Sequence, residues 1–293
     1  ARASELQMLA QEIARLTDGS FGFIGEAANS VGGYLAGAVP GAGGLNAAAM
    51  IEQPRAAYVT LNLEPDLDLA NPAAAMAALD GAQLVVALTS FDSPSLRQVA
   101  DVMLPIAPFT ETSGTFVNCE GRAQSFTAVA KPFADVRPGW KVLRVLGNLL
   151  ALEGFAHADS EAVRAEALAG DLASRLDNGV EGIVVSSATG PAGVLERVAD
   201  VPIHFADPIA RRAPSLQKTR DAAAPTARIA PATLAALGLA AGDRVRVAQG
   251  TASVELVAQA DDGLAAGCVR VAAAHPSTAA LGAMSGDLSV ERA

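Results

Sequence analysis

The sequence has few of the residues that bind metals or form covalent crosslinks. Only two cysteines, Cys119 and Cys268, occur in 293 residues, and they lie far apart in different segments. An iron-sulfur cluster usually takes four thiolates, and a disulfide framework needs several pairs. His157, His204 and His275 show no metal-site spacing, and lone histidines usually form local hydrogen bonds. We therefore expect this chain alone to hold no metal and no cofactor.

Long apolar runs and an excess of positive charge are also missing. Although 51% of the residues are hydrophobic, the densest run, QLVVAL at 83–88, is far shorter than the roughly 20 residues of a membrane-spanning helix. The net charge of -10 argues against nucleic-acid or anionic-lipid partners, which need a basic face. We expect a globular chain that inserts into no membrane and whose partners are small molecules or proteins.

The first residues carry charge and form an amphipathic pattern, which differs from the apolar core of an export signal. Leu6, Leu9, Ile13 and Leu16 recur at helical spacing from the very start, and the first residue is not Met. We interpret the sequence as a piece of a longer protein. Breakers at 17–20, TDGS, precede an apolar run, FGFI at 21–24, which predicts a buried strand.

Further apolar runs at 57–63, 83–88 and 102–105 alternate with helical patterns at 95–101, 139–152 and 160–176. Asn71 can cap another helix, whose first turn suits Pro72. Strands without polar alternation, separated by helices, indicate a parallel sheet that is covered on both faces. The first half is therefore predicted to be an α/β domain.

The composition and the residue pattern of the sequence change after residue 200. Residues 207–226 hold three prolines and several cationic side chains, a composition typical of a linker. Four later stretches alternate apolar and polar residues around glycine turns, at 227–229, 243–247, 252–257 and 268–271. We predict an α/β domain at 1–206, a linker at 207–226 and a small C-terminal β-barrel at 227–293.

The densest pattern of special residues is ADVMLP at 100–105, followed by ETSGTFVNCEGR at 111–122. Pro105 ends a strand, and Gly114 permits a left-handed turn. Glu120 and Arg122 fall on one side of an extended segment, where they can pair across a buried crossing. Two weaker glycine-containing stretches, GAGGLN at 41–46 and SSATGP at 186–191, are interpreted as a loop and a helix start.

The same residues carry a resemblance to a known family. The pattern A-D-V-x-L-P, then E-x-x-G-T-F-x-N-x-E-G-R, is similar to that of the molybdopterin oxidoreductase superfamily. This resemblance implies a parallel-sheet, Rossmann-like domain of the molybdopterin-oxidoreductase type. The stretch 229–245, which begins with IAP and ends with LGLAAGDRV, resembles the C-terminal barrel that binds the pterin dinucleotide in active members.

Three further stretches resemble one branch of that superfamily, the G subunits of respiratory NADH-quinone oxidoreductases (complex I): ANSVGGYLAGAVP at 28–40, LNLEPD at 61–66 and DPIARRAPSLQKT at 207–219. This branch is understood to keep the fold while losing the pterin and its chemistry. The resemblance therefore implies no catalytic residue and only fold-holding roles for the motif residues. These are Glu111, Gly114, Asn118, Glu120, Gly121 and Arg122. It also implies iron-sulfur clusters in a part of the protein that precedes this chain.

The implied function is a structural, non-catalytic part of a peripheral-arm subunit, which supports electron transfer from NADH to quinone. Other subunits of that arm are the implied partners, at the cytoplasmic face of the bacterial inner membrane. Two alternatives stay open. One is part of an active molybdopterin-dependent oxidoreductase, such as a formate dehydrogenase relative whose metal ligand lies upstream of Ala1. The other is a free-standing module whose barrel binds a nucleotide or a peptide.

The linker gathers positive charge in an otherwise acidic chain, on Arg211, Arg212, Lys218 and Arg220. Its prolines are expected to hold the segment extended and accessible. Guanidinium groups suit bidentate contact with carboxylates, so one hypothesis is that the linker docks on an acidic patch of a neighbouring subunit or of the N-terminal half that precedes this chain. The equally weighted alternative is that these charges neutralise the chain's own acidic surface.

Overall fold

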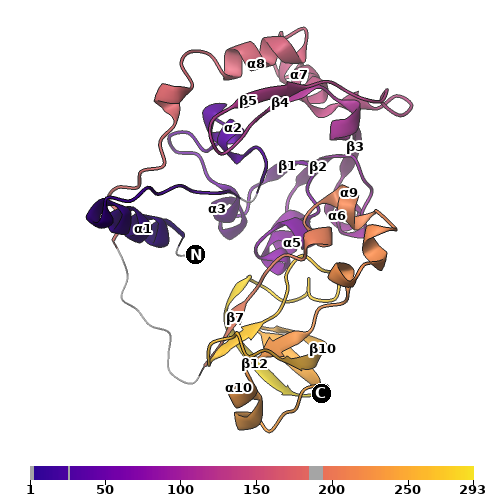
Figure 1. The fold of residues 1–293 in the computed structure, drawn as a ribbon. Helices are drawn as coiled ribbons and strands as arrows, with labels where there is room; N and C mark the ends of the chain where they lie inside the picture. Colours follow the sequence, from indigo (N-terminus) through magenta and orange to yellow (C-terminus); the bar gives the residue numbers. More distant parts are fainter. Residues whose placement is uncertain (1–2, 26, 185–193) are drawn as a thin grey trace. The chain divides into compact units, whose positions relative to one another are not determined.

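The computed structural model describes residues 3–25, 27–184 and 194–293. These residues form two compact units, each assembled from two separate stretches of the chain (Figure 1). Within the described ranges, the first unit takes residues up to 49 and 105–184, and the second takes 50–104 and 194–293. The stretch 186–191, expected to start a helix, lies outside the described residues.

The first unit is built around a β-hairpin and several helices. The hairpin pairs Gly114 with Phe126 and Val117 with Ala123 in antiparallel register. Helix α2 contacts it, because the Asn29 Oδ1 atom accepts a hydrogen bond from the Val117 N–H at 2.8 Å. The helices of this unit are α1 (Ala3–Thr17), α2 (Ser30–Leu35), α7 (Gly139–Leu149) and α8 (Ser160–Ala167), with 3-10 turns at Phe109–Glu111 and Ala173–Arg175. Its strands are β4 (Gly114–Val117), β5 (Ala123–Phe126) and β6 (Arg137–Pro138).

Two expectations for the first unit are wrong. Residues 21–24 form no strand, and Phe23 and Ile24 are 60% and 84% exposed. The helix expected at 160–176 ends at Ala167, because Gly170 turns the chain with a φ of 83°. Its cap is Asp159, whose Oδ1 atom accepts a hydrogen bond from the Ala162 N–H at 2.8 Å.

The α/β part of the second unit contains a parallel strand pair, as the sequence predicts. Strand β1 (Ala57–Leu61) runs parallel to β2 (Leu84–Thr89), with Ala57 opposite Leu84 and Leu61 opposite Leu88. In this unit the strand order is β1-β2-β3, and β3 (Val102–Ala107) continues past residue 104 into the first unit. There Ile106 and Ala107 pair in parallel with Arg137 and Pro138 of β6. The remaining helices are α3 (Ala47–Glu52), α4 (Pro65–Asp68), α5 (Pro72–Asp80) and α6 (Pro94–Val99). Asn71 caps α5 as expected, with its Oδ1 atom 3.2 Å from the Ala74 nitrogen.

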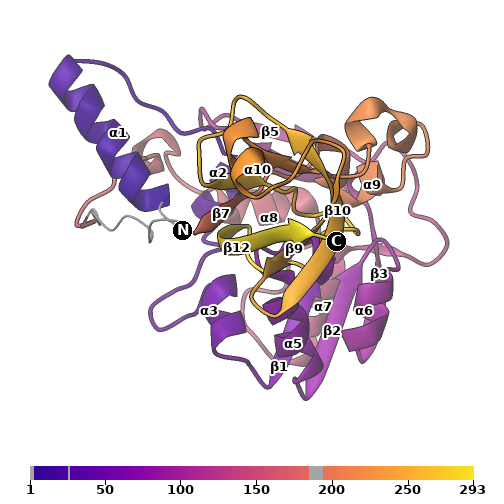
Figure 2. The same cartoon turned by 90° about the horizontal axis from the view of Figure 1, so that it is seen from below.

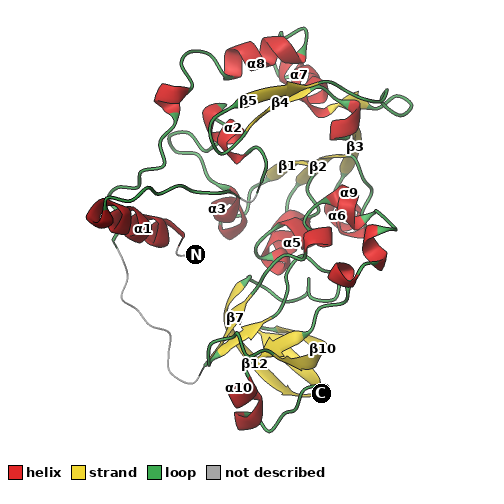
Figure 3. Ribbon diagram, viewed as in Figure 1, coloured by secondary structure: helices red, strands yellow, loops and turns green. Residues whose placement is uncertain are grey.

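Helices α5 and α6 cover one face of this strand pair (Figure 3). Leu79 of α5 and Val99 of α6 form a buried cluster with Val85 of β2, and Tyr58 of β1 packs against it. On the other face of β1, Val59 and Leu61 are 56% and 52% exposed. Within the second unit, α5 and α6 therefore supply the expected cover on one face of the strand pair.

The second unit also contains the predicted β-barrel, which is closed and has the strand order β10-β8-β11-β7-β12-β9. Figure 2 shows β9, β10 and β12 side by side. Ile229, Val245, Val247 and Val269 are fully buried inside it, because alternate residues of each strand face inward. Its elements are β7 (Leu195–Val198), β8 (Ala227–Ile229), α10 (Pro231–Ala236), β9 (Arg244–Gln249), β10 (Ala252–Ala260), β11 (Cys268–Arg270) and β12 (Ser285–Arg292).

The barrel differs from the sequence prediction in its strands β7 and β12. Strand β7 lies before residue 207, in the stretch assigned to the α/β domain, yet it pairs with β11 and β12. Its Arg197 is 1% exposed and is one of the largest fully buried side chains. The predicted domain boundary at 206 therefore separates β7 from the barrel that it helps to close.

Arg197 is held by the oxygen atoms of one side-chain amide and several backbone carbonyls. Its guanidinium donates to the Gln249 Oε1 atom at 3.1 Å, to the Ala272 carbonyl at 3.1 Å and to the Ala283 carbonyl at 3.0 Å. Longer bonds reach the carbonyls of Val271 and Gly282, both at 3.4 Å. Burial lowers the pKa of Arg197 because it disfavours the charged form. One side chain thus fastens both ends of the segment 271–283 to the barrel.

Replacing Arg197 with Met should lower the free energy of unfolding by about 2–4 kcal/mol, because buried carbonyl oxygens lose their donors. The matched control is Arg246→Met, at an exposed position of β9 whose ion pair with Glu291 spans 3.4 Å at the surface. This control should change stability by less than about 1 kcal/mol. Urea denaturation measures both values. Equal midpoints for the two variants would contradict the role given to Arg197.

Candidate functional site

The carboxyl ends of β1 and β2 form the candidate site, because open α/β sheets usually bind ligands at this edge. Asn62 follows β1 with a φ of 49°, and its Oδ1 atom accepts bonds from both the N–H and the hydroxyl of Ser90, each at 3.1 Å. Ser93 then caps α6 through a 3.2 Å bond from the Leu96 N–H. These bonds fix the loops after β1 and β2 relative to each other.

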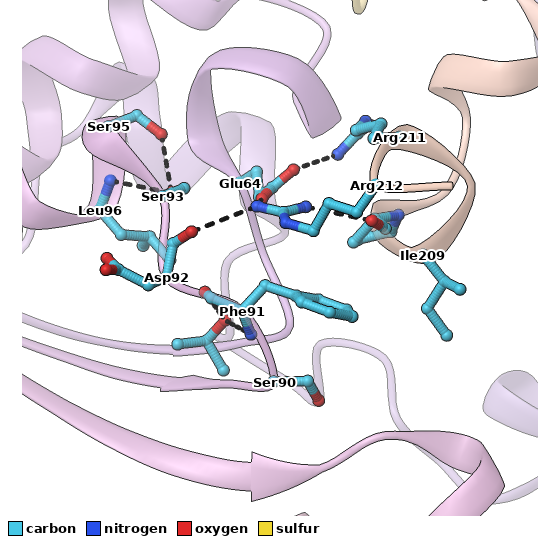
Figure 4. A network of polar contacts seen from close by, with 12 residues as sticks. Glu64, Ser90, Phe91, Asp92, Ser93, Ser95, Leu96, Ile209, Arg211 and Arg212 are labelled. Atoms are coloured by element: carbon cyan, nitrogen blue, oxygen red, sulfur yellow. Dashed lines mark hydrogen bonds and ion pairs between the residues drawn. The ribbon is translucent and has the colours of Figure 1, made fainter. Parts of the chain in front are cut away.

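Glu64 is the central residue of this edge. It stands before α4 and is only 3% exposed, so its carboxylate needs partners. Arg211 Nη1 lies 2.7 Å from its Oε2 atom, and Arg212 Nη2 contacts its Oε1 atom (Figure 4). Both carboxylate oxygens therefore bind a guanidinium group.

Arg211 is almost completely enclosed, with its side chain 6% exposed. Its Nη2 atom pairs with the Asp68 Oδ1 atom at 2.5 Å, and its Nε atom donates to the Phe205 carbonyl at 2.7 Å. Burial alone would lower the pKa of Arg211, but the bonds and charges of Asp68 and Glu64 outweigh it, so this pKa lies above its ordinary value. Arg211 is therefore a permanent cation inside the second unit.

Arg212 lies against Phe91 and Asp92, in the loop that follows β2. Its guanidinium carbon lies 4.6 Å from the ring centroid of Phe91, a cation–π arrangement. The same group donates to the Pro208 carbonyl at 3.1 Å and to the Asp92 carbonyl at 3.3 Å. We call the set Glu64, Asp68, Arg211 and Arg212 the arginine clamp.

The segment that carries the two arginines is folded, not extended. It contains α9 (Pro208–Arg211) and 3-10 turns at Ile203–Phe205, Leu216–Lys218 and Arg220–Ala222. Asp207 caps α9, because its Oδ1 atom accepts bonds from the N–H groups of Ile209 and Ala210 at 2.7 and 3.1 Å. The expectation of an extended, accessible linker is therefore wrong.

The arginine clamp bears directly on the docking hypothesis. Arg211 and Arg212 pair with carboxylates of the same chain, the arrangement described by the alternative interpretation of the charge cluster. Docking of a partner at Lys218 and Arg220, which are both exposed, stays a prediction. The sequence patterns did not single out Glu64 or Asp68. The only signal for Glu64 was its place in the stretch LNLEPD, and Asp68 lies just beyond it.

The motif at 111–122 forms the β4–β5 hairpin and its turn. Asn118 builds the turn, because its Oδ1 atom accepts bonds from the N–H groups of Glu120 and Arg122 at 3.1 and 2.9 Å. The left-handed residue is Gly121, with a φ of 80°, and not Gly114 as predicted. Gly114 instead allows a close approach, since a Cβ atom there would lie 2.8 Å from the Phe126 ring.

The predicted buried pair of Arg122 with a glutamate is also wrong. Both Arg122 and Glu120 are exposed, so neither side chain depends on the other for charge compensation. Glu111 has a different role, because its Oε2 atom accepts a bond from the Phe133 N–H at 3.0 Å. The motif thus holds a turn and a neighbouring loop by bonds to backbone N–H groups.

The side chains suited to metal binding are scattered over the described ranges. There, no three His, Cys, Asp or Glu side chains lie close enough to hold a metal ion together. Cys119 is exposed, Cys268 is half-buried, and both are free thiols. No helix in the described part of the chain is long and apolar enough to cross a membrane.

Residues 1–149 match the family model described as molybdopterin oxidoreductase, and residues 208–288 match that of the Molydopterin dinucleotide binding domain. The chain belongs to the molybdopterin oxidoreductase family. This confirms the superfamily predicted from the motifs. Acetylene hydratase from Pelobacter acetylenicus shares the fold, with a TM-score of 0.55 and 17% identity over 84% of this chain and 46% of that one.

Two curated relatives match shorter stretches. The G subunit of NADH-quinone oxidoreductase from Mycobacterium bovis is 40% identical over 92 residues, which are 30% of this chain and 11% of that protein. A protein named as a formate dehydrogenase in Staphylococcus aureus is 41% identical over 54 residues, 18% of this chain and 6% of its own length. The predicted similarity to the G subunit is therefore confirmed, over a small part of the relatives' length.

The family implies a pterin dinucleotide, whose phosphates are anionic. The residues at the carboxyl ends of β1 and β2 do not fit such a group, because Arg212 fills the space over Phe91 and Glu64 already binds both guanidinium groups. A phosphate brought here would face the buried carboxylate of Glu64 and would have to displace it from its guanidinium partners. This edge of the sheet is built to hold two segments of the chain together.

Replacing Gly121 with Ala should lower the free energy of unfolding by about 1–3 kcal/mol, because a left-handed backbone strains a residue with a Cβ atom. The new atom would also lie 2.1 Å from the Leu176 Cδ1 atom. Gly33→Ala in α2 is the control, since a Cβ atom there meets nothing within 4 Å. Thermal melting should separate the two variants, and a control that melts lower than Gly121→Ala would refute this account.

Replacing Arg211 with Met should cost about 3–5 kcal/mol of stability, because the buried Glu64 carboxylate keeps only Arg212 as a guanidinium partner and Asp68 loses its pair with Arg211. The control is Arg97→Met, which breaks a surface pair with Asp92 whose side chains are 71% and 51% exposed. Because solvent screens that pair, the control should unfold at nearly the wild-type denaturant concentration. Chemical denaturation compares them. A wild-type midpoint for Arg211→Met would show that the arginine clamp contributes nothing to stability.

Proposed function

We propose that this chain is a structural, non-catalytic part of a peripheral-arm subunit of NADH-quinone oxidoreductase. It supports electron transfer from NADH to quinone by holding the cluster-bearing part of the same protein and its neighbours. The iron-sulfur clusters belong to that other part, and the assembly works at the cytoplasmic face of the membrane. Similarity to the G subunit of the Mycobacterium bovis enzyme supports the choice of assembly.

The arginine clamp is the observation that carries the non-catalytic part of the proposal. A catalytic edge needs an accessible acid, base or ligand-binding surface. Here both oxygens of Glu64 and the nitrogens of Arg211 are used within the chain. The same geometry opposes the alternative of an active molybdopterin oxidoreductase, because the family's ligand would compete with Arg212 at this edge.

The proposal is tested by tagging the natural protein that carries this chain and purifying it from its own cells. The expected material is a multi-subunit complex that oxidises NADH with quinone, contains iron and contains far less than one molybdenum per tagged protein. Stoichiometric molybdenum, with formate oxidation that does not need NADH, would favour the formate dehydrogenase relative. Recovery of the tagged protein alone, without other subunits, would favour the free-standing binding module.

A further inference from the structure

The loop between β5 and β6, residues 127–136, has a defined backbone path. Figure 1 shows this segment running out from β5 before it returns to α7. Four of its N–H groups donate to the stretch 110–113. The bonds run from Ala128 to Ser113 Oγ at 3.4 Å, from Val129 to the Thr110 carbonyl at 3.0 Å, from Ala130 to the same carbonyl at 3.2 Å and from Phe133 to Glu111 Oε2 at 3.0 Å. The motif residue Glu111 thus helps to position this loop.

This fastened loop presents two large apolar side chains to solvent. Val129 is 85% exposed and Phe133 is 78% exposed, with the exposed Lys131 between them. A flexible loop could turn such side chains inward. Here the hydrogen bonds from the N–H groups of residues 128, 129, 130 and 133 fix the backbone that carries them. Apolar side chains displayed on a fastened loop are typical of a protein interaction site.

The sequence that contains the loop is basic between Glu120 and Glu153, in a chain that is otherwise strongly acidic. Residues 121–152 carry five cations and one carboxylate, whereas the whole chain has a net charge of -10. The cations are Arg122, Lys131, Arg137, Lys141 and Arg144, and the carboxylate is Asp135. Lys131 is exposed on the loop, and Arg137 and Lys141 are exposed on the residues that follow it, against the exposed Asp135 of the loop. Charge complementarity therefore calls for an acidic partner.

We propose that the β5–β6 loop is a docking site for an acidic surface of another protein subunit. Val129 and Phe133 would enter an apolar depression on that surface, and Lys131 would pair with carboxylates at its rim. The partner's place in the same assembly rests on the proposed function. An anionic membrane is a less suitable binding partner for this loop than an acidic protein surface. The rest of the chain is negatively charged, so an extended anionic surface would repel the chain.

The test places a photoreactive benzoylphenylalanine at position 133 of the full-length protein in its own cells. Illumination should link it to a protein of the purified complex, and mass spectrometry should find aspartate or glutamate residues beside the linked site. Position 23, another phenylalanine and 60% exposed, is the matched control. The yield of crosslinks formed from position 23 should not change when Lys131 is replaced.

A charge reversal, Lys131→Glu, should lower the yield of the link at 133 by about tenfold, because attraction becomes repulsion. Arg55→Glu makes the same change in charge at an exposed site of the second unit and should leave the yield unchanged. Added salt should weaken the link in the wild type. Reversing the partner's carboxylates to lysine should restore the link to the Lys131→Glu variant.

The outcomes separate this inference from the proposed function. A tagged protein that purifies in the complex but links to nothing at 133, or equally well with Lys131→Glu, would overturn the docking site alone. Links to lipid, together with flotation of the protein on vesicles rich in phosphatidylglycerol, would assign the loop to a membrane instead. A protein that purifies without any other subunit would overturn the proposed function as well.

Discussion

The arginine clamp ties together the two chain segments that form the second unit. Its carboxylates come from the loop and helix after β1, and its arginines come from α9, more than a hundred residues later in the chain. A buried carboxylate without its guanidinium is costly, so each half of the clamp requires the other. Because Arg211 also binds the Phe205 carbonyl, the clamp orders the short helices that lead from β7 to β8.

For the proposed non-catalytic role, this arrangement gives a physical account of how a fold would keep its architecture without its chemistry. The strand ends remain, together with the helix caps at Asn71 and Ser93 and the turn at Asn62. At this edge Arg212 lies over the Phe91 ring, and Glu64 pairs with both arginines, so these groups are used for contacts within the chain. The motif residues Asn118 and Glu111 hold backbone in place by accepting hydrogen bonds from N–H groups of the turn and the neighbouring loop.

Local patterns predicted much of the fold, because each depends on neighbouring residues. Continuous apolar runs located β1, β2 and β3, and period-two alternation located four barrel strands. Strand β7 was missed because its inward residue is Arg197, which reverses the expected pattern. The arginine clamp was missed because its carboxylates and arginines are far apart in sequence, and no local pattern shows which carboxylate an arginine meets. Gly114 and Gly121 lie in one motif, and only the backbone distinguishes a close approach from a left-handed turn.

The position of β7 has a consequence for the order in which the barrel is completed. This strand is synthesised before α9 and before every other strand of the barrel, yet its partners are β11 and β12. Strand β7 therefore stays unpaired until the strands that flank it have left the ribosome. Until then the Arg197 guanidinium also lacks the acceptors that it binds in the folded barrel. Pairing over such long separations slows folding, because loop closure is unfavourable until the contacts form. During that interval the nascent chain exposes a cation and an unpaired strand, so this stretch is prone to aggregation until the barrel closes.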